Sequence, residues 1–63
     1  MIKKGDLLKD VLDSKICLAI SDQYESFDLY ESFEIKILIV IDVLKGDEIK
    51  TLEIKNLTKL NND

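Results

Sequence analysis

Several residue types that build active sites and metal sites are missing from this chain of 63 residues. It contains no histidine and a single cysteine, Cys17. One thiolate and no imidazole cannot supply the four nitrogen or sulfur ligands of a typical structural zinc site, and one cysteine cannot form a disulfide within the chain. The lack of histidine also removes the side chain that most often transfers protons in enzymes. We therefore expect no catalytic residue, no metal and no cofactor.

Long apolar segments are absent as well. The longest apolar run spans residues 37–41, whereas a membrane-spanning helix needs about 20 apolar residues. Lys3 and Lys4 stand where a signal peptide begins, but Asp6, Lys9 and Asp10 interrupt the apolar segment that should follow. We expect a cytoplasmic protein with no membrane contact.

Positive charge is scarce, and all of it comes from lysine. The 9 lysines face 13 acidic residues, which gives a net charge of −4. An acidic surface repels phosphate, so nucleic acid is not the expected partner, and the acidity is expected to serve solubility. A local lysine cluster could still override the average. The alternative hypothesis is therefore a nucleic-acid accessory protein with a lysine-lined edge at Lys36, Lys50 and Lys55.

The segment from Ile35 to Ile54 is the most informative part of what is present. It has a long β-branched run, a break at Lys45-Gly46-Asp47 and a second apolar-polar run, which together predict a β-hairpin with positive φ at Gly46. Residues 34–44 form the expected central strand. Alternation predicts a core face and an outer face. The core face comprises Ile35, Ile37, Ile39, Ile41 and Val43, and the outer face comprises Lys36, Leu38, Val40, Asp42 and Leu44.

The first third of the chain predicts two more strands. Residues 1–11 favour a strand entered through Gly5-Asp6, with a helix over residues 6–12 as the competitor. A turn at residues 13–15 leads to a strand over residues 16–21, whose small residues suggest close packing on one face. We expect Cys17 to be a small buried hydrophobe, and Asp10 and Asp13 to be solvated carboxylates near the turn.

The segment 22–34 holds all four aromatic residues of the chain and repeats itself, because Tyr-Glu-Ser-Phe begins at both Tyr24 and Tyr30. A six-residue shift places both copies on the same faces of an extended chain, so we expect extended arms around a turn near Asp28. The two tyrosines could form a recognition surface for a partner. Alternatively, Phe27 and Phe33 fill the core while the tyrosines cover its edge.

The C-terminal third predicts a returning strand over residues 48–54 and a tight turn with a last short strand over residues 56–60. Ile49 and Leu52 fall out of strict alternation, which suggests a bulge near Thr51. Leu57 and Leu60 are expected to point inward.

These pieces together resemble the small SH3-like barrels of bacteriophage and related bacterial proteins. The resemblance lies in Lys4-Gly5-Asp6-Leu7-Leu8-Lys9-Asp10, Ile39-Val40-Ile41-Asp42, Gly46-Asp47-Glu48-Ile49 and Asn56-Leu57-Thr58-Lys59-Leu60. It implies an all-β fold, a five-stranded SH3-like barrel or roll formed as one domain by residues 1–63. For a phage-encoded protein it implies residence in the host cytoplasm. The chain lacks the tryptophan and the Ala-Leu-Tyr-Asp-Tyr-like motif of peptide-binding SH3 domains, so the resemblance implies a fold and no binding function.

Two apolar neighbours on the expected outer face, Leu38 and Val40, suggest where a partner could bind, because adjacent exposed apolar side chains need an explanation. Either segment 22–34 covers them, or they form a subunit interface together with Tyr24 and Tyr30. A domain this small has a thin core, which favours self-association. The sequence therefore predicts a non-catalytic protein-interaction or structural module that forms a homo-oligomer.

Overall fold

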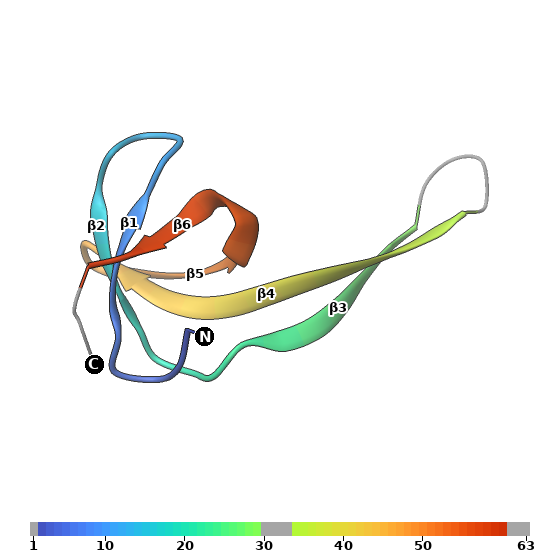
Figure 1. The fold of residues 1–63 in the computed structure, drawn as a ribbon, viewed down its shortest axis with the longest axis horizontal. Coiled ribbons are helices and arrows are strands. Elements are labelled where there is room, and N and C mark those ends of the chain that lie inside the picture. The colour runs from blue at the N-terminus through green and yellow to red at the C-terminus, as the bar shows by residue number, and fades with distance from the viewer. Residues whose placement is uncertain (1, 30–33, 61–63) are drawn as a thin grey trace.

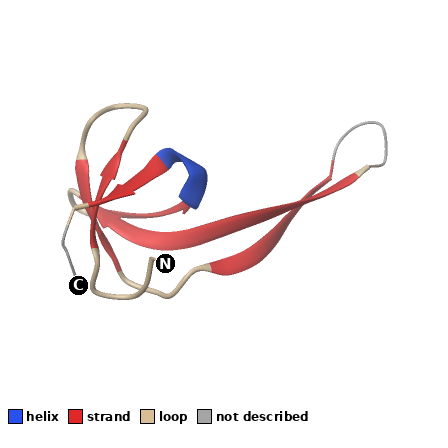
Figure 2. Cartoon of the chain, in the orientation of Figure 1, coloured by secondary structure: helices blue, strands red, loops and turns tan. Residues whose placement is uncertain are grey.

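The computed structural model describes residues 2–29 and 34–60, and nearly all regular structure in it is extended (Figure 2). The predicted all-β fold is confirmed, and the first strand forms in place of the competing helix. In chain order the elements are β1 (Leu7–Asp10), β2 (Ile16–Ala19), β3 (Tyr24–Leu29), β4 (Ile35–Lys45), β5 (Glu48–Glu53), the 3₁₀ turn η1 (Ile54–Asn56) and β6 (Leu57–Lys59).

The strands form one strongly curled antiparallel sheet. β5, β4, β2, β1 and β6 are neighbours in that order and make a half-barrel, while β3 pairs with the first half of β4. This second pairing projects from the half-barrel as a two-stranded ribbon, which we call the arm: β3 together with residues 35–39 of β4 (Figure 1). The arm gives the molecule its length, since its extents are 39 × 22 × 17 Å.

Within the described residues the sheet has six strands instead of the predicted five, because part of the segment expected to be extended after residue 21 pairs with β4 as β3. A large bulge separates β2 from β3. Ala19 pairs with Val43, and Tyr24 pairs with Val40. Four residues, 20–23, therefore lie opposite two residues, 41–42. Extra residues on one strand bend it and raise its twist, which separates β2 from β3. The offset is even, so the two faces of the sheet stay the same on both sides of the bulge.

The core lies on the inner face of the half-barrel. Its buried members are Leu8, Cys17, Ala19, Ile41, Val43 and Leu57. Cys17 is buried as predicted, and the small residues of β2 do pack closely. The prediction that the whole isoleucine row of β4 is core was wrong for Ile35 and Ile37, which are 68% and 57% exposed. They lie in the arm, beyond the reach of the strands that cover Ile41.

Three details of the strands and turns differ from the sequence prediction, and two agree with it. Gly46 has the predicted positive φ of 65°, but β5 pairs with β4 in unbroken register, so the predicted bulge near Thr51 was wrong. β3 continues past Asp28 to pair Leu29 with Ile35, so the turn predicted near Asp28 was also wrong. Leu57 is buried as expected, whereas Leu60 is exposed.

Candidate functional site

The predicted interface residues do not form one exposed surface. Val40 is only 4% exposed within the single chain, so its assignment to an exposed outer surface was wrong. Leu38 is half-buried, and Tyr24 is exposed. Tyr30 and Phe33 lie outside the described residues. In the register Val40 lies between Tyr24 of β3 and Glu53 of β5, so it is flanked by a strand on each edge.

Tyr24 is fixed at the junction between the arm and the half-barrel by a hydrogen-bond cluster around Asp42. The Tyr24 hydroxyl donates to Asp42 Oδ1 over 2.6 Å, and the Thr51 hydroxyl donates to the same oxygen over 2.7 Å. The Asp42 backbone N–H donates to Ser21 Oγ over 3.1 Å. One aspartate therefore connects β3, β5 and the bulge to β4.

This cluster shifts the pKa values of its two titratable members in opposite directions. The hydroxyl of Tyr24, and then that of Thr51, lower the pKa of Asp42 because they donate to its charged form. The bond to the Asp42 carboxylate raises the pKa of Tyr24, since ionisation would remove the donated proton. The arrangement is a structural clamp that is most stable with Asp42 charged and Tyr24 neutral.

The arm carries an exposed apolar surface on one of its two faces. Phe27 and Ile37 are directly paired and are 68% and 57% exposed, and Ile35 on the same face is 68% exposed. We call these three residues the arm face. The opposite face is more polar, with Asp28 across from Lys36 and Ser26 across from Leu38. The arm face continues the row that is buried in the half-barrel as Ile41 and Val43.

A second apolar surface crosses the outside of the half-barrel, and the sequence interpretation did not identify it. We call this surface the outer stripe. Its five residues, given below in spatial order, have exposed fractions of 38–71%. In the register Leu7 pairs with Leu18, Leu18 with Leu44, and Leu44 with Ile49. The Leu60 N–H donates to the Leu7 carbonyl over 2.8 Å and continues the row. In spatial order the outer stripe is Leu60, Leu7, Leu18, Leu44 and Ile49. The sequence signal for it was Ile49 itself, whose departure from core alternation marks an outward apolar residue.

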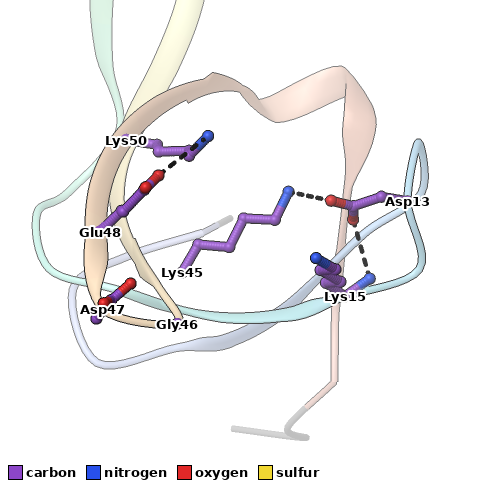
Figure 3. Close-up of a pocket in the computed structure, with 7 residues that line it drawn as sticks. All are labelled: Asp13, Lys15, Lys45, Gly46, Asp47, Glu48 and Lys50. Carbon is purple, nitrogen blue, oxygen red and sulfur yellow. Dashed lines mark hydrogen bonds and ion pairs between the residues drawn. The ribbon is translucent and has the colours of Figure 1, made fainter.

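A polar hollow of about 300 Å³ opens between the turn at residues 45–48 and the turn at residues 13–15 (Figure 3). Three lysines and three carboxylates line it together with Gly46: Asp13, Lys15, Lys45, Asp47, Glu48 and Lys50. These charges balance, so the hollow favours neither an anion nor a cation.

Lys45 forms ion pairs with two aspartates beside this hollow. Its Nζ lies 2.9 Å from Asp10 Oδ2 and also contacts Asp13 Oδ2. Asp10 is 4% exposed, so the expectation of a solvated carboxylate was wrong for this residue. Hydrogen bonding to Lys45 lowers the pKa of both aspartates and raises that of Lys45. The cluster therefore ties the first turn to the end of β4 and closes one end of the core.

The three lysines predicted to line a nucleic-acid edge are not gathered in the structure. Lys50 pairs with Val43, seven residues along β4 from Lys36, which corresponds to about 23 Å of strand. Lys50 Nζ lies 3.4 Å from Glu48, and Lys55 Nζ lies 3.3 Å from Glu53. Lys36 stands opposite Asp28. Nucleic-acid binding stays an untested prediction.

Across residues 2–29 and 34–60, no cluster of three histidine, cysteine or acidic side chains could hold a metal ion. In the same ranges no helix is long and apolar enough to cross a membrane. Comparison with protein families, curated proteins and solved structures gives no match for this chain.

Proposed function

We propose that this protein is a non-catalytic protein-interaction module that self-associates, and that its arm supplies the contact surface. One observation carries the proposal: three large apolar side chains of the arm face are more than half exposed on a ribbon of two strands. Exposed apolar groups of this size on a small protein mark an interaction site.

The energetics of the ribbon support the same proposal. A hairpin of two strands is marginally stable on its own in water. Among the described strands, β3 pairs with β4 alone, and residues 35–39 of β4 pair with β3 alone. Both long edges of the arm therefore have backbone groups available for pairing, which is a hazard unless a partner covers them. Burying one large apolar side chain would contribute roughly 1.5–3 kcal/mol to association.

We also propose the finer fold assignment, an SH3-like roll of the kind found in bacteriophage proteins. The strong curl of the sheet and the antiparallel pairing of β1 with β6, near the two ends of the chain, support it. The fold itself implies no activity, because function depends on sites and not on architecture.

Two neighbouring substitutions on the arm test the proposal. Ile37→Thr removes an apolar group from the arm face, while Lys36→Thr changes the other face of the same strand. Threonine suits a strand in both cases. Sedimentation equilibrium should show an oligomer for the unmodified chain at micromolar concentration. The dissociation constant should rise about tenfold or more for Ile37→Thr and little for Lys36→Thr. A monomeric unmodified chain at high micromolar concentration would contradict self-association.

A further inference from the structure

The outer stripe is unusual because it makes part of the sheet apolar on both faces. Antiparallel sheets with one solvated face normally alternate between an apolar inside and a polar outside. Here Leu18 and Leu44 lie on the outside, next in sequence to the buried Cys17 and Val43 on the inside. A sheet that is apolar on both faces is normally covered on both faces. Something outside the described chain should therefore cover the stripe.

We infer that the outer stripe is the receiving surface for the arm of a second copy of this chain. The inference rests on the proposed self-association and adds to it the place where the arm binds. Each chain then contributes one arm and one stripe, so two chains can exchange arms reciprocally around a twofold axis and close as a dimer.

The arm cannot reach the outer stripe of its own chain. β4 runs without interruption from the arm into the half-barrel, from Ile35 to Lys45, and the arm projects away from the half-barrel (Figure 1). The arm face also belongs to the inner side of the sheet, whereas the stripe belongs to the outer side. Folding the arm back onto its own stripe would require β4 to break, so the occupant has to be another molecule.

The outer stripe is long enough to receive the arm. From Ile35 to Ile39 the arm advances four residues, or about 14 Å at the usual strand rise. From Leu60 to Ile49 the stripe crosses four strand spacings, or about 19 Å. Because the stripe runs across the strands, an arm laid along it crosses them at nearly a right angle. Near-perpendicular contact is one of the two common ways in which β-sheets pack face to face.

Charge and area also favour a second copy. The stripe residues are uncharged, and Lys9 lies on the same outer face, two positions beyond Leu7 on β1. The arm face is flanked by the exposed Glu25, which is opposite Ile39. A stable interface buries about 800 Å² on each partner, roughly a sixth of the 4678 Å² exposed by this chain. Reciprocal exchange lets each chain contribute two apolar surfaces toward that area.

An affinity comparison tests the stripe separately from the arm. Ile49→Thr changes the most exposed residue of the stripe, at 71%, and Lys50→Thr changes its neighbour on the inner side of β5. Ile49→Thr should raise the dissociation constant about tenfold, and Lys50→Thr should not. If Ile37→Thr weakens association while Ile49→Thr behaves like Lys50→Thr, the stripe assignment fails and the proposed self-association stands. If the unmodified chain is monomeric, both fail.

Disulfide trapping tests the contact directly. A chain carrying Ile37→Cys is mixed with a chain carrying Leu44→Cys under mild oxidation, and the native Cys17 is buried in both. We expect a crosslinked heterodimer to form at least about tenfold faster than in a mixture where Lys36→Cys replaces Ile37→Cys, since the control thiol lies on the other face of the arm. Equal rates in the two mixtures would overturn the arm-on-stripe contact. The true interface would then be formed with a different protein or by the edges of the arm.

Discussion

The two halves of β4 carry the same kind of apolar row in opposite environments. In the second half, Ile41 and Val43 have no exposed surface, whereas Ile35 and Ile37 in the first half are 68% and 57% exposed. All four side chains lie on the same face of one unbroken strand. The chemistry of the side chains therefore does not explain why one half is core and the other is surface.

The difference lies in how many strands flank each half. Residues 40–45 have β5 on one edge, and residues 43–44 also have β2 on the other, so the sheet there is wide enough to curl around its own inner face. Residues 35–39 have β3 alone. A ribbon two strands wide has no opposing layer, so its apolar face stays exposed until another surface covers it.

The largest expected effect comes from shortening the same residue type in the two halves. Ile41→Ala should lower the free energy of unfolding by about 2–5 kcal/mol, because it removes buried groups and leaves a cavity. Ile37→Ala should lower it by less than about 0.5 kcal/mol at concentrations where the protein is monomeric, because exposed sites contribute little. Urea titration followed by circular dichroism measures both values.

Because the full truncation can unfold a small domain, Ile41→Val serves as the milder variant, with an expected loss of about 0.5–1.5 kcal/mol in the free energy of unfolding. Ile37→Val is its matched control in the arm. Equal losses at positions 37 and 41 in dilute solution would mean that the arm is covered in the monomer, which contradicts the comparison.

The second prediction concerns pH and the ion pairs of Lys45 with Asp10 and Asp13. Asp10 and Asp13 have pKa values lowered chiefly by Lys45, so below about pH 4 the unfolded state takes up protons before the folded state does. Their contribution to stability is complete above that pH and is lost as the pH falls through the lowered folded values. Urea midpoints measured from pH 6 to pH 2 should show this decline.

Lys45→Met should remove the cause of the shift. The variant should be less stable than the unmodified chain at neutral pH, and the gap should narrow as the pH falls below about 4, because protonation removes the same interaction from both. Lys50→Met, which loses only the exposed pair with Glu48, should show no comparable narrowing. A constant gap for Lys45→Met at all pH values would show that its apolar stem, and not its charge, stabilises the turn.

Sequence patterns predicted the strands well because each strand is a local property. The alternation in β4 and the positive φ of Gly46 depend on neighbours within a few residues. The prediction that the whole isoleucine row of β4 is core was wrong because alternation gives the face on which a residue lies but not the number of strands that cover that face. Ile35 and Ile41 look identical in this respect, and only the pairing of distant segments separates them.

The candidate surfaces were harder to predict for the same reason. The outer stripe joins Leu60, Leu7, Leu18, Leu44 and Ile49. Of its neighbouring pairs, only Leu44 and Ile49, which face each other across the hairpin turn, are close in the sequence. The buried Val40 is flanked by Tyr24, sixteen residues earlier, and by Glu53, thirteen residues later. Self-association was predicted from the thin core, but the described residues suggested for it, Leu38, Val40 and Tyr24, are on the more polar face of the arm and at its base.

The smallest expected effect concerns the clamp that separates the two halves of β4. Tyr24→Phe keeps an aromatic ring opposite Val40 and removes the hydroxyl that donates to Asp42. Global stability should change little because the hydroxyl is exposed, but the arm should open more often. Hydrogen exchange at low concentration should therefore quicken at the amides that pair β3 with residues 35–39, while amides of β1 and β2 keep their protection.

Thr51→Val is the control that makes this prediction specific. It removes the other hydroxyl bonded to Asp42 Oδ1, so both variants should raise the pKa of Asp42 toward its ordinary value, which a carboxyl titration by nuclear magnetic resonance can follow. Thr51 lies on β5 and not on the arm, so Thr51→Val should leave exchange in the arm unchanged. If both variants quicken exchange in the arm equally, the charge state of Asp42 controls the junction and the bond from Tyr24 has no separate role. If neither does, the strand pairing alone holds the arm in place.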